Sequence, residues 1–252
     1  MTSTQTAGAR PGRSLFYVGM AILFALIGFL GFTPTYWSKL ATGSFGGNPI
    51  LHVHGVLFFG WTVLYIIQTG LVASGRTMNH RALGLLGISW FTAMAIAVVL
   101  ANINAIKVAQ AMGVGDAAAR FSAVSLLSLG LMICIFVLAI ANVNRPEMHK
   151  RFMILFMIPM MQAALARVFM VIMPPPPGAF GPPPIFVSLP PGVVACLLLL
   201  IPIIHDWRTR GRPHPVYLIG LPVLALQIIS TVPIGNSAGW IAFANGLAGL
   251  AR

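Results

Sequence analysis

Residues 51–73 read LHVHGVLFFGWTVLYIIQTGLVA, a run without a charged side chain that is long enough to cross a bilayer as one helix. The hydrocarbon core of a bilayer is roughly 30 Å thick, and a helix of about 20 apolar residues spans it. Six further runs of this kind occur in the 252 residues. We therefore predict seven transmembrane helices, at about 15–33, 51–73, 82–103, 121–142, 151–173, 185–204 and 215–234.

The composition agrees with this interpretation. Hydrophobic residues make up 58% of the chain and charged residues 7%, whereas soluble domains are about 25% charged. We predict an all-α integral membrane protein whose seven helices form one bundle at 15–234. Residues 1–14 are expected to be a polar tail and 235–252 a short segment at the outer membrane surface. The connections between the runs leave no room for a soluble catalytic domain.

The distribution of basic residues predicts the orientation. Lysine and arginine number 15 against three acidic residues, which gives a net charge of +12. Ten of the basic residues lie in the tail and in the connections on the same side as the tail, and four lie on the other side. The positive-inside rule then places the N-terminus in the cytoplasm. A basic membrane protein meets anionic lipid headgroups, so we expect the bilayer as its partner and no nucleic acid.

All six histidines lie at the ends of apolar runs: His52, His54, His80, His149, His205 and His214. Histidine ligates haem iron and other metals and carries protons near neutral pH, so this placement indicates redox or proton chemistry. His80 and His149 both fall at the cytoplasmic side. We expect these two to share a ligand and the others, apart from His54, to be interfacial.

The second run carries its polar groups on one face. His54, Trp61, Tyr65 and Gln68 are spaced by seven, four and three residues, which is the spacing of a helical stripe. We expect this face, including His54 and Gln68, to point into the bundle.

The fifth run has a similar stripe. His149 and Arg167 are eighteen residues apart, five whole turns, and so project from one face about 27 Å apart along the axis. An arginine so deep in an apolar run should face the protein interior or water. Arg167 and His54 therefore predict an outer site, for a haem propionate, a quinone carbonyl or an anionic lipid group.

Two neighbouring features have alternative interpretations. Gly84 and Gly87 share a face with His80, and small residues either let a neighbouring helix approach or leave room for a macrocycle. Asp206, beside His205 and several arginines, is read as a charged interfacial anchor, with a role as second shell of a metal-binding histidine as the alternative.

Three motifs carry a resemblance. The chain contains HxHG at His52–Gly55 with Gln68 near the end of the same run, GRxxxHRxLG at Gly75–Gly84, and MHKRxM at Met148–Met153 with Arg167 beyond it. In these it resembles an uncharacterised family of predicted bacterial multi-pass membrane proteins, over roughly residues 49–167. The resemblance implies the bacterial inner (cytoplasmic) membrane and supports the choice of site residues.

A looser similarity is to transmembrane cytochromes b of the ascorbate-dependent ferric reductase kind, in which histidines at helix ends hold two haems. That similarity implies His54, His80 and His149 as openings of the first, second and fourth core helices. The third core helix, about 121–142, has no histidine, so the partner of His54 is missing. The similarity thus implies at most one haem b, with His80 and His149 as its metal ligands.

We therefore expect a membrane electron-transfer protein, b-type haem-linked or quinone-linked, in which His80 and His149 ligate iron and His54, Gln68 and Arg167 serve cofactor binding or proton supply. It could be a subunit of a redox complex. One alternative is a cofactor-free accessory subunit of a larger respiratory or photosynthetic membrane complex. A second is a transporter or a lipid-modifying membrane enzyme, although clustered histidine boxes of the diiron kind are absent from the sequence.

Overall fold

The computed structural model describes residues 15–250, and every regular element in that range is helical. Seven spans are long and apolar enough to cross a membrane, which confirms the predicted all-α membrane bundle. The predicted tail at 1–14 lies outside the described residues. The elements are α1 (Phe16–Gly31), a π-helical turn η1 (Thr33–Trp37), α2 (Ser38–Ala41), α3 (Pro49–Ala73), α4 (Thr77–Ala111), α5 (Gly115–Ala141), α6 (Pro146–Ile172), η2 (Ile185–Ser188), α7 (Leu189–Leu197), α8 (Leu200–Arg210), α9 (Pro215–Asn236) and α10 (Ala238–Gly249).

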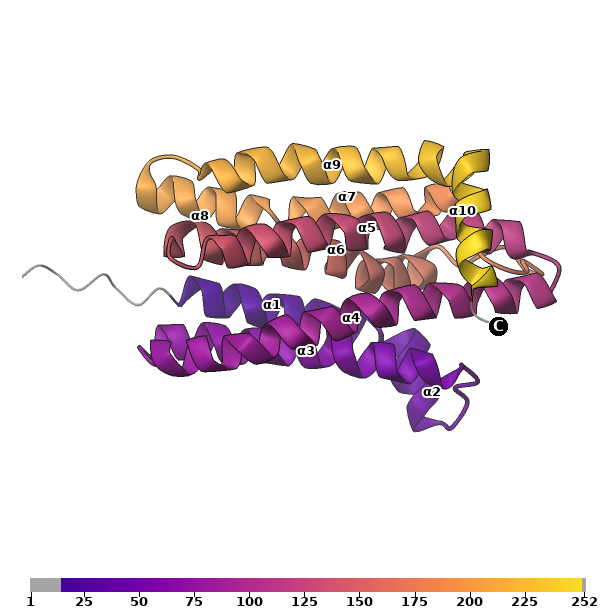
Figure 1. Cartoon of the computed structure of the whole chain (residues 1–252), viewed down its shortest axis with the longest axis horizontal. Coiled ribbons are helices and arrows are strands. Elements are labelled where there is room, and N and C mark those ends of the chain that lie inside the picture. Colours follow the sequence, from indigo (N-terminus) through magenta and orange to yellow (C-terminus); the bar gives the residue numbers. More distant parts are fainter. Residues whose placement is uncertain (1–14, 251–252) are drawn as a thin grey trace, which may run out of the picture.

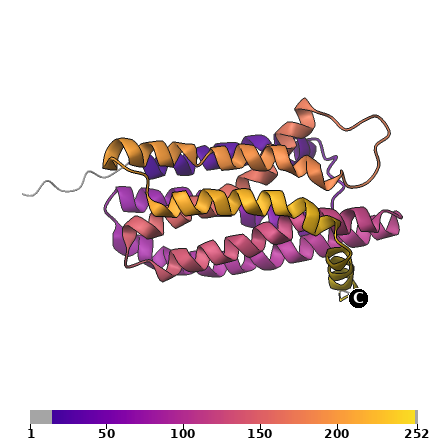
Figure 2. The same ribbon diagram turned by 90° about the horizontal axis from the view of Figure 1, so that it is seen from above.

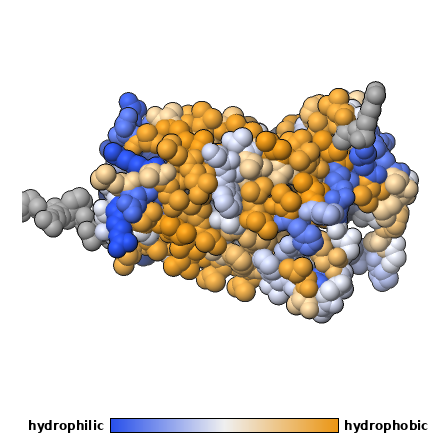
Figure 3. Space-filling view, turned by 60° about the horizontal axis from the view of Figure 1, so that its bottom comes forward, coloured by the Kyte–Doolittle hydropathy of each residue, from blue (hydrophilic) through white to orange (hydrophobic). Residues whose placement is uncertain are grey.

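Five helices form a closed ring. α1 packs on α3, α3 on α4, α4 on α5, α5 on α6, and α6 back on α1, while α7 and α9 lie outside the ring against α6 and α5 (Figures 1 and 2). We call the end with the α3–α4, α5–α6 and α8–α9 turns the basic end. The end with α2, α10 and the proline-rich loop 173–184 is the proline end. On the face shown in Figure 3, hydrophilic residues gather at the two ends and hydrophobic residues cover most of the waist between them.

Aromatic side chains fill the middle of the ring. Trp61, Phe91, Phe136 and Phe156 come from four different helices of the ring, and their ring centroids lie 4.5 to 6.1 Å apart. All four side chains are buried. Such tilted and edge-to-face pairs add to the packing energy of burial. The polar groups of the ring are therefore separated into two sets, one at each mouth.

α4 is much longer than predicted. It runs over 35 residues, Thr77–Ala111, where the apolar pattern predicted 82–103, and α5 begins at Gly115 instead of 121. The helices continue past the apolar stretch because they pack on α10, around a small core of Ile106 and alanines. The segment after 235, expected to be a short surface piece, contains the twelve-residue helix α10.

The sixth span is interrupted. A continuous helix was expected at 185–204, but α7 ends at Leu197 and α8 begins at Leu200. Pro202 explains the break, because a proline ring clashes with the carbonyl four residues earlier, here that of Leu198. By contrast, α6 continues as one helix through Pro159.

Candidate functional site

The structure brings His80 and His149 together at the basic end. His80 lies in the first turn of α4 and His149 in the first turn of α6, and both side chains are half-buried. Their ring centroids are 6.2 Å apart and their planes meet at 71°. α4 and α6 are not neighbours in the ring, since α5 packs between them along most of their length. The pair therefore joins two helices across the mouth.

Each of the two imidazoles has an oriented Nδ1. His149 Nδ1 lies 2.8 Å from the carbonyl oxygen of Ala139, so this nitrogen carries the proton and donates it. The lone pair of His149 is then on Nε2. His80 Nδ1 lies 2.8 Å from the side-chain amide of Gln68, which comes from α3. A metal-binding histidine usually donates its second ring N–H in this way.

The Gln68 amide decides the tautomer of His80. With the amide oxygen toward His80, Nδ1 donates and Nε2 is free to ligate. With the amide turned, its nitrogen donates to His80 Nδ1 at 2.8 Å and to the His80 carbonyl at 3.2 Å, while its oxygen accepts from the Gly84 N–H at 3.1 Å. The turned amide satisfies more partners, and it leaves the proton of a neutral His80 on Nε2. The orientation of the Gln68 amide thus decides whether His80 Nε2 has a lone pair for a metal or carries a proton that it can donate.

The glycines beside His80 are used for helix packing. A Cβ on Gly84 would lie 3.9 Å from the Gln68 amide nitrogen, and one on Gly87 would lie 3.9 Å from Leu64 Cδ2. Both glycines therefore face α3, which supports the interpretation that small residues let the helices approach. The alternative, that they leave a flat space for a macrocycle, is not supported by these neighbours.

The proline end holds the second predicted pair, His54 and Arg167. The His54 ring stacks on Phe58 with centroids 4.3 Å apart, and its Nδ1 is buried without a hydrogen-bond partner among residues 15–250. Arg167 lies over the ring of Phe32 at 4.2 Å and donates one N–H to the Ala163 carbonyl at 2.8 Å. These two residues share a mouth of the ring, and neither belongs to the His80–His149 site.

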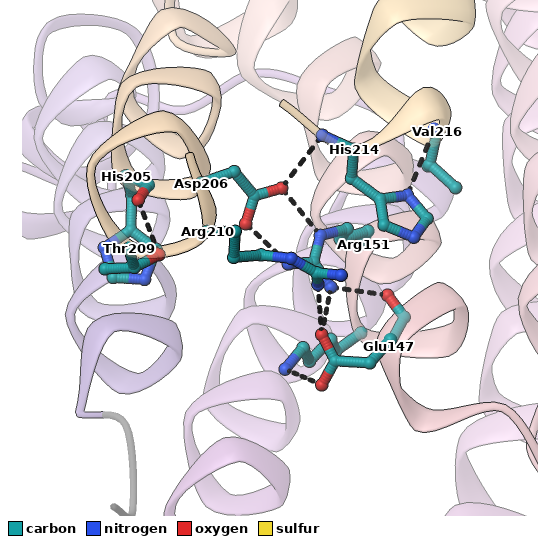
Figure 4. Close-up of polar contacts among 9 residues, drawn as sticks. Glu147, Arg151, His205, Asp206, Thr209, Arg210, His214 and Val216 are labelled. Atoms are coloured by element: carbon teal, nitrogen blue, oxygen red, sulfur yellow. Dashed lines mark hydrogen bonds and ion pairs between the residues drawn. The ribbon is translucent and has the colours of Figure 1, made fainter. Parts of the chain in front are cut away.

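The largest polar network was missed by the sequence analysis. Arg151 is 2% exposed and Asp206 is 1% exposed, and they pair through two hydrogen bonds, Nε to Oδ2 at 2.8 Å and Nη2 to Oδ1 at 2.5 Å (Figure 4). Arg151 Nη1 also donates to the carbonyl and the carboxylate of Glu147, each at 2.7 Å. Asp206 is therefore a buried partner of Arg151, and the expectation of an interfacial anchor was wrong.

This network fastens three helices at the basic end. Glu147 accepts a further hydrogen bond from Arg210 at 2.6 Å and one from Lys150 at 2.5 Å. Asp206 accepts from the backbone N–H of His214 at 3.3 Å. The signal in the sequence was the scarcity of acids: with only three in the chain, a Glu147–Arg151 spacing of four and an Asp206 two residues beyond an apolar run should have indicated partners.

The remaining histidines have local roles. His52 Nδ1 is 2.9 Å from the Tyr36 hydroxyl, and His205 stacks on Phe16 with centroids 3.7 Å apart. His214 caps α9, because its Nδ1 accepts from the Val216 N–H at 3.2 Å. Burial, and then the charge of Arg151, lower the pKa of His214, which keeps this nitrogen available as an acceptor. These contacts are consistent with the interfacial roles expected for all three.

Over residues 15–250, no group of three or more histidine, cysteine, aspartate or glutamate side chains is arranged to hold a metal ion. The histidine pair can therefore supply two ligands and no more. Comparison with known proteins gives no further guide, since no family model, no curated protein and no solved structure matches the chain.

Proposed function

We propose that this chain is an electron-transfer protein of the bacterial inner membrane, in which His80 and His149 would hold one b-type haem. The observation that carries the proposal is the pair of half-buried imidazoles with centroids 6.2 Å apart, each with its Nδ1 held 2.8 Å from an amide or carbonyl group. The seven apolar spans around this pair agree with a redox carrier embedded in the bilayer.

The spacing suits one metal atom between two imidazoles. A metal–nitrogen bond is about 2.0 Å and the ring centre lies roughly 1 Å beyond the nitrogen, so two opposed ligands have centroids about 6 Å apart. Two protein ligands are too few for zinc, which takes three or four. They are the number that haem iron needs, since the macrocycle supplies the other four.

Haem b in this position would supply one-electron chemistry. The protein's part is to fix the ligands. Ala139 holds the His149 proton on Nδ1. Gln68 does the same for His80 only with its amide oxygen toward the ring, so the turned amide, which satisfies more partners, would have to rotate when haem binds. Because the ligands come from α4 and α6, their geometry depends on the α3 and α5 packing that surrounds them.

An oxidised-minus-reduced visible spectrum of the purified full chain tests the proposal, with a haem assay on the same sample. We expect one haem per chain, and its loss in both His80→Ala and His149→Ala. His52→Ala is the matched control, because His52 lies at the other end of the ring and should leave the spectrum unchanged. A chain without haem absorbance would overturn the proposal and favour the cofactor-free accessory subunit.

The Gln68 side chain sharpens this test. In Gln68→Glu the carboxylate can only accept, so it fixes the His80 proton on Nδ1 and should retain haem with a lowered midpoint potential. In Gln68→Leu the ring is no longer oriented, and haem occupancy should fall. Equal behaviour of the two variants would show that Gln68 has no part in ligand orientation.

A quinone-linked role without haem is the second candidate. The Trp61 Nε1–H is buried inside the ring without an acceptor among residues 15–250, and His54 Nδ1 on the same face of α3 is likewise unpartnered. An indole N–H can only donate, so a bound carbonyl oxygen would satisfy it. Decylubiquinone that quenches the fluorescence of the wild type, but much less that of Trp61→Phe, would support this role.

A further inference from the structure

A groove on the lipid-facing side separates parts of α1 and α6 in the half of the molecule near the proline end. Its volume is about 360 Å³, and its walls are aliphatic: Leu23, Ile27 and Leu30 from α1, Leu165 and Val168 from α6. At its end toward the proline loop, the two helices touch. A Cβ on Gly31 would come within 2.7 Å of the Ala164 carbonyl oxygen, so only glycine permits this contact.

Arg167 lies beside the end of this groove and is not itself part of its wall. It lies between the groove residues Leu165 and Val168 in the sequence of α6, and its guanidinium lies over Phe32, which follows Gly31 directly. A guanidinium carries five N–H donors, so one hydrogen bond to a carbonyl leaves others for a further acceptor. Among the described residues, only the Ala163 carbonyl accepts from it.

The depth of Arg167 matches a lipid headgroup. It follows His149, at the basic end, by eighteen residues or about 27 Å of helix, close to the roughly 30 Å of a hydrocarbon core. The groove then descends from Gly31 to Leu23, about 12 Å toward the middle of the bilayer. A cation at the boundary of the hydrocarbon core and an apolar groove below it fit an amphiphile whose headgroup lies at Arg167.

We propose that this groove binds an anionic phospholipid, with its phosphate on Arg167 and one acyl chain along α1 and α6. Charge complementarity selects this occupant. No described carboxylate pairs with Arg167, although Arg151 on the same helix has two. A phosphate accepts two parallel N–H bonds from one guanidinium, which a neutral carbonyl cannot match. The site is independent of the histidine pair and of any haem there.

Native mass spectrometry of the full chain, delipidated and then supplied with phosphatidylglycerol or phosphatidylcholine, tests this proposal. We expect the wild type to prefer phosphatidylglycerol and to gain thermal stability from it. Arg167→Gln should lower that preference about tenfold, the effect of roughly 1.4 kcal/mol. Arg120→Gln, which removes an exposed arginine from α5, is the control and should keep the preference.

A second pair of variants tests the part of the groove that would hold the acyl chain and leaves the charge of Arg167 unchanged. Val168→Phe fills the groove and should weaken binding of both lipids, whereas Val171→Phe adds the same ring one turn further on, at an exposed position outside the groove. Equal affinity for the two lipids, equal effects of the two arginine variants, or equal effects of the two valine variants would each overturn the proposal. Retention of a quinone in place of phospholipid would also overturn it.

Discussion

Arg151 and Arg167 lie on one helix, sixteen residues apart, but they differ in burial and in their hydrogen-bond partners. Arg151 is 2% exposed and donates to two carboxylates and a carbonyl. Arg167 is half-buried and donates to a single carbonyl. A buried cation paired with two carboxylates holds the fold together, and a cation without a carboxylate partner can bind something else. The difference lies in their partners and could not be read from their depth in the apolar run.

Removing the partner of Arg151 should have the largest effect. In Asp206→Asn the shape is kept but the charge is lost, so Arg151 remains buried without its main counter-charge. We expect the free energy of unfolding to fall by about 3–5 kcal/mol, seen as a lower melting temperature in detergent. Asp116→Asn changes an exposed acid at the proline end and is the matched control. Equal melting temperatures would show that the Arg151 pair is not what fastens the basic end.

The second-largest effect on stability is expected at the close contact between α1 and α6, beside Arg167. In Gly31→Ala the new methyl group meets the Ala164 backbone at 2.7 Å, so α1 must move away from α6. We expect a loss of about 1–3 kcal/mol, the usual result of overpacking. Gly28→Ala, one turn earlier on the same helix, has nothing within 4 Å of the new atom and should be neutral or stabilising. Similar melting temperatures for the two variants would contradict a close α1–α6 contact.

A smaller effect is expected from pH, because His214 beside the Arg151 network can titrate. Because the pKa of His214 is lowered in the folded protein, the unfolded chain binds its proton first, and stability should fall as pH drops below about 6.5. Protonation removes the acceptor that caps α9, a loss below the usual 1 kcal/mol of a cap because His214 is only half-buried. His214→Asn keeps a cap but cannot titrate, so its melting temperature should vary less between pH 7.5 and 5 than that of the wild type. An unchanged pH dependence would exclude His214 as its source.

The smallest effect is expected at Arg167 itself. In Arg167→Met the stacking on Phe32 and one hydrogen bond are lost, but a charge no longer has to be held in the apolar region. We expect the melting temperature of the lipid-free protein to change by the equivalent of about 0.5 kcal/mol or less. A loss of stability as large as that of Asp206→Asn would show that Arg167, like Arg151, mainly stabilises the fold.

The apolar runs predicted the seven spans because bilayer thickness alone sets their length. They did not predict where α4 ends, since its last turns are stabilised by α10, a helix 130 residues away in the sequence. The break between α7 and α8 could have been predicted from Pro202. The many leucines around it, however, favoured one continuous apolar span.

The positions of the candidate residues in the fold were predicted in part. Helical spacing placed Gln68, Trp61 and Tyr65 on one inward face, and Trp61 and Tyr65 are indeed buried. The pairing of His80 with His149 followed from their shared side of the membrane, and the structure brings them together. The partner of Arg151 could not be found by spacing, because Asp206 is on another helix and a lone acid beside arginines usually meets water.

The length of α4 gives the molecule a different profile at its two ends. Its 35 residues measure about 52 Å, so some 20 Å exceed a hydrocarbon core of roughly 30 Å. About 12 Å of this excess, residues 104–111, lies at the proline end, where α5 and α10 pack around it on a small core of Ile106 and alanines. A thicker bilayer could therefore cover part of this extension, where Val108 is exposed, whereas a thinner one would leave apolar surface of the spans in water. The protein should tolerate a change of membrane thickness in one direction better than in the other.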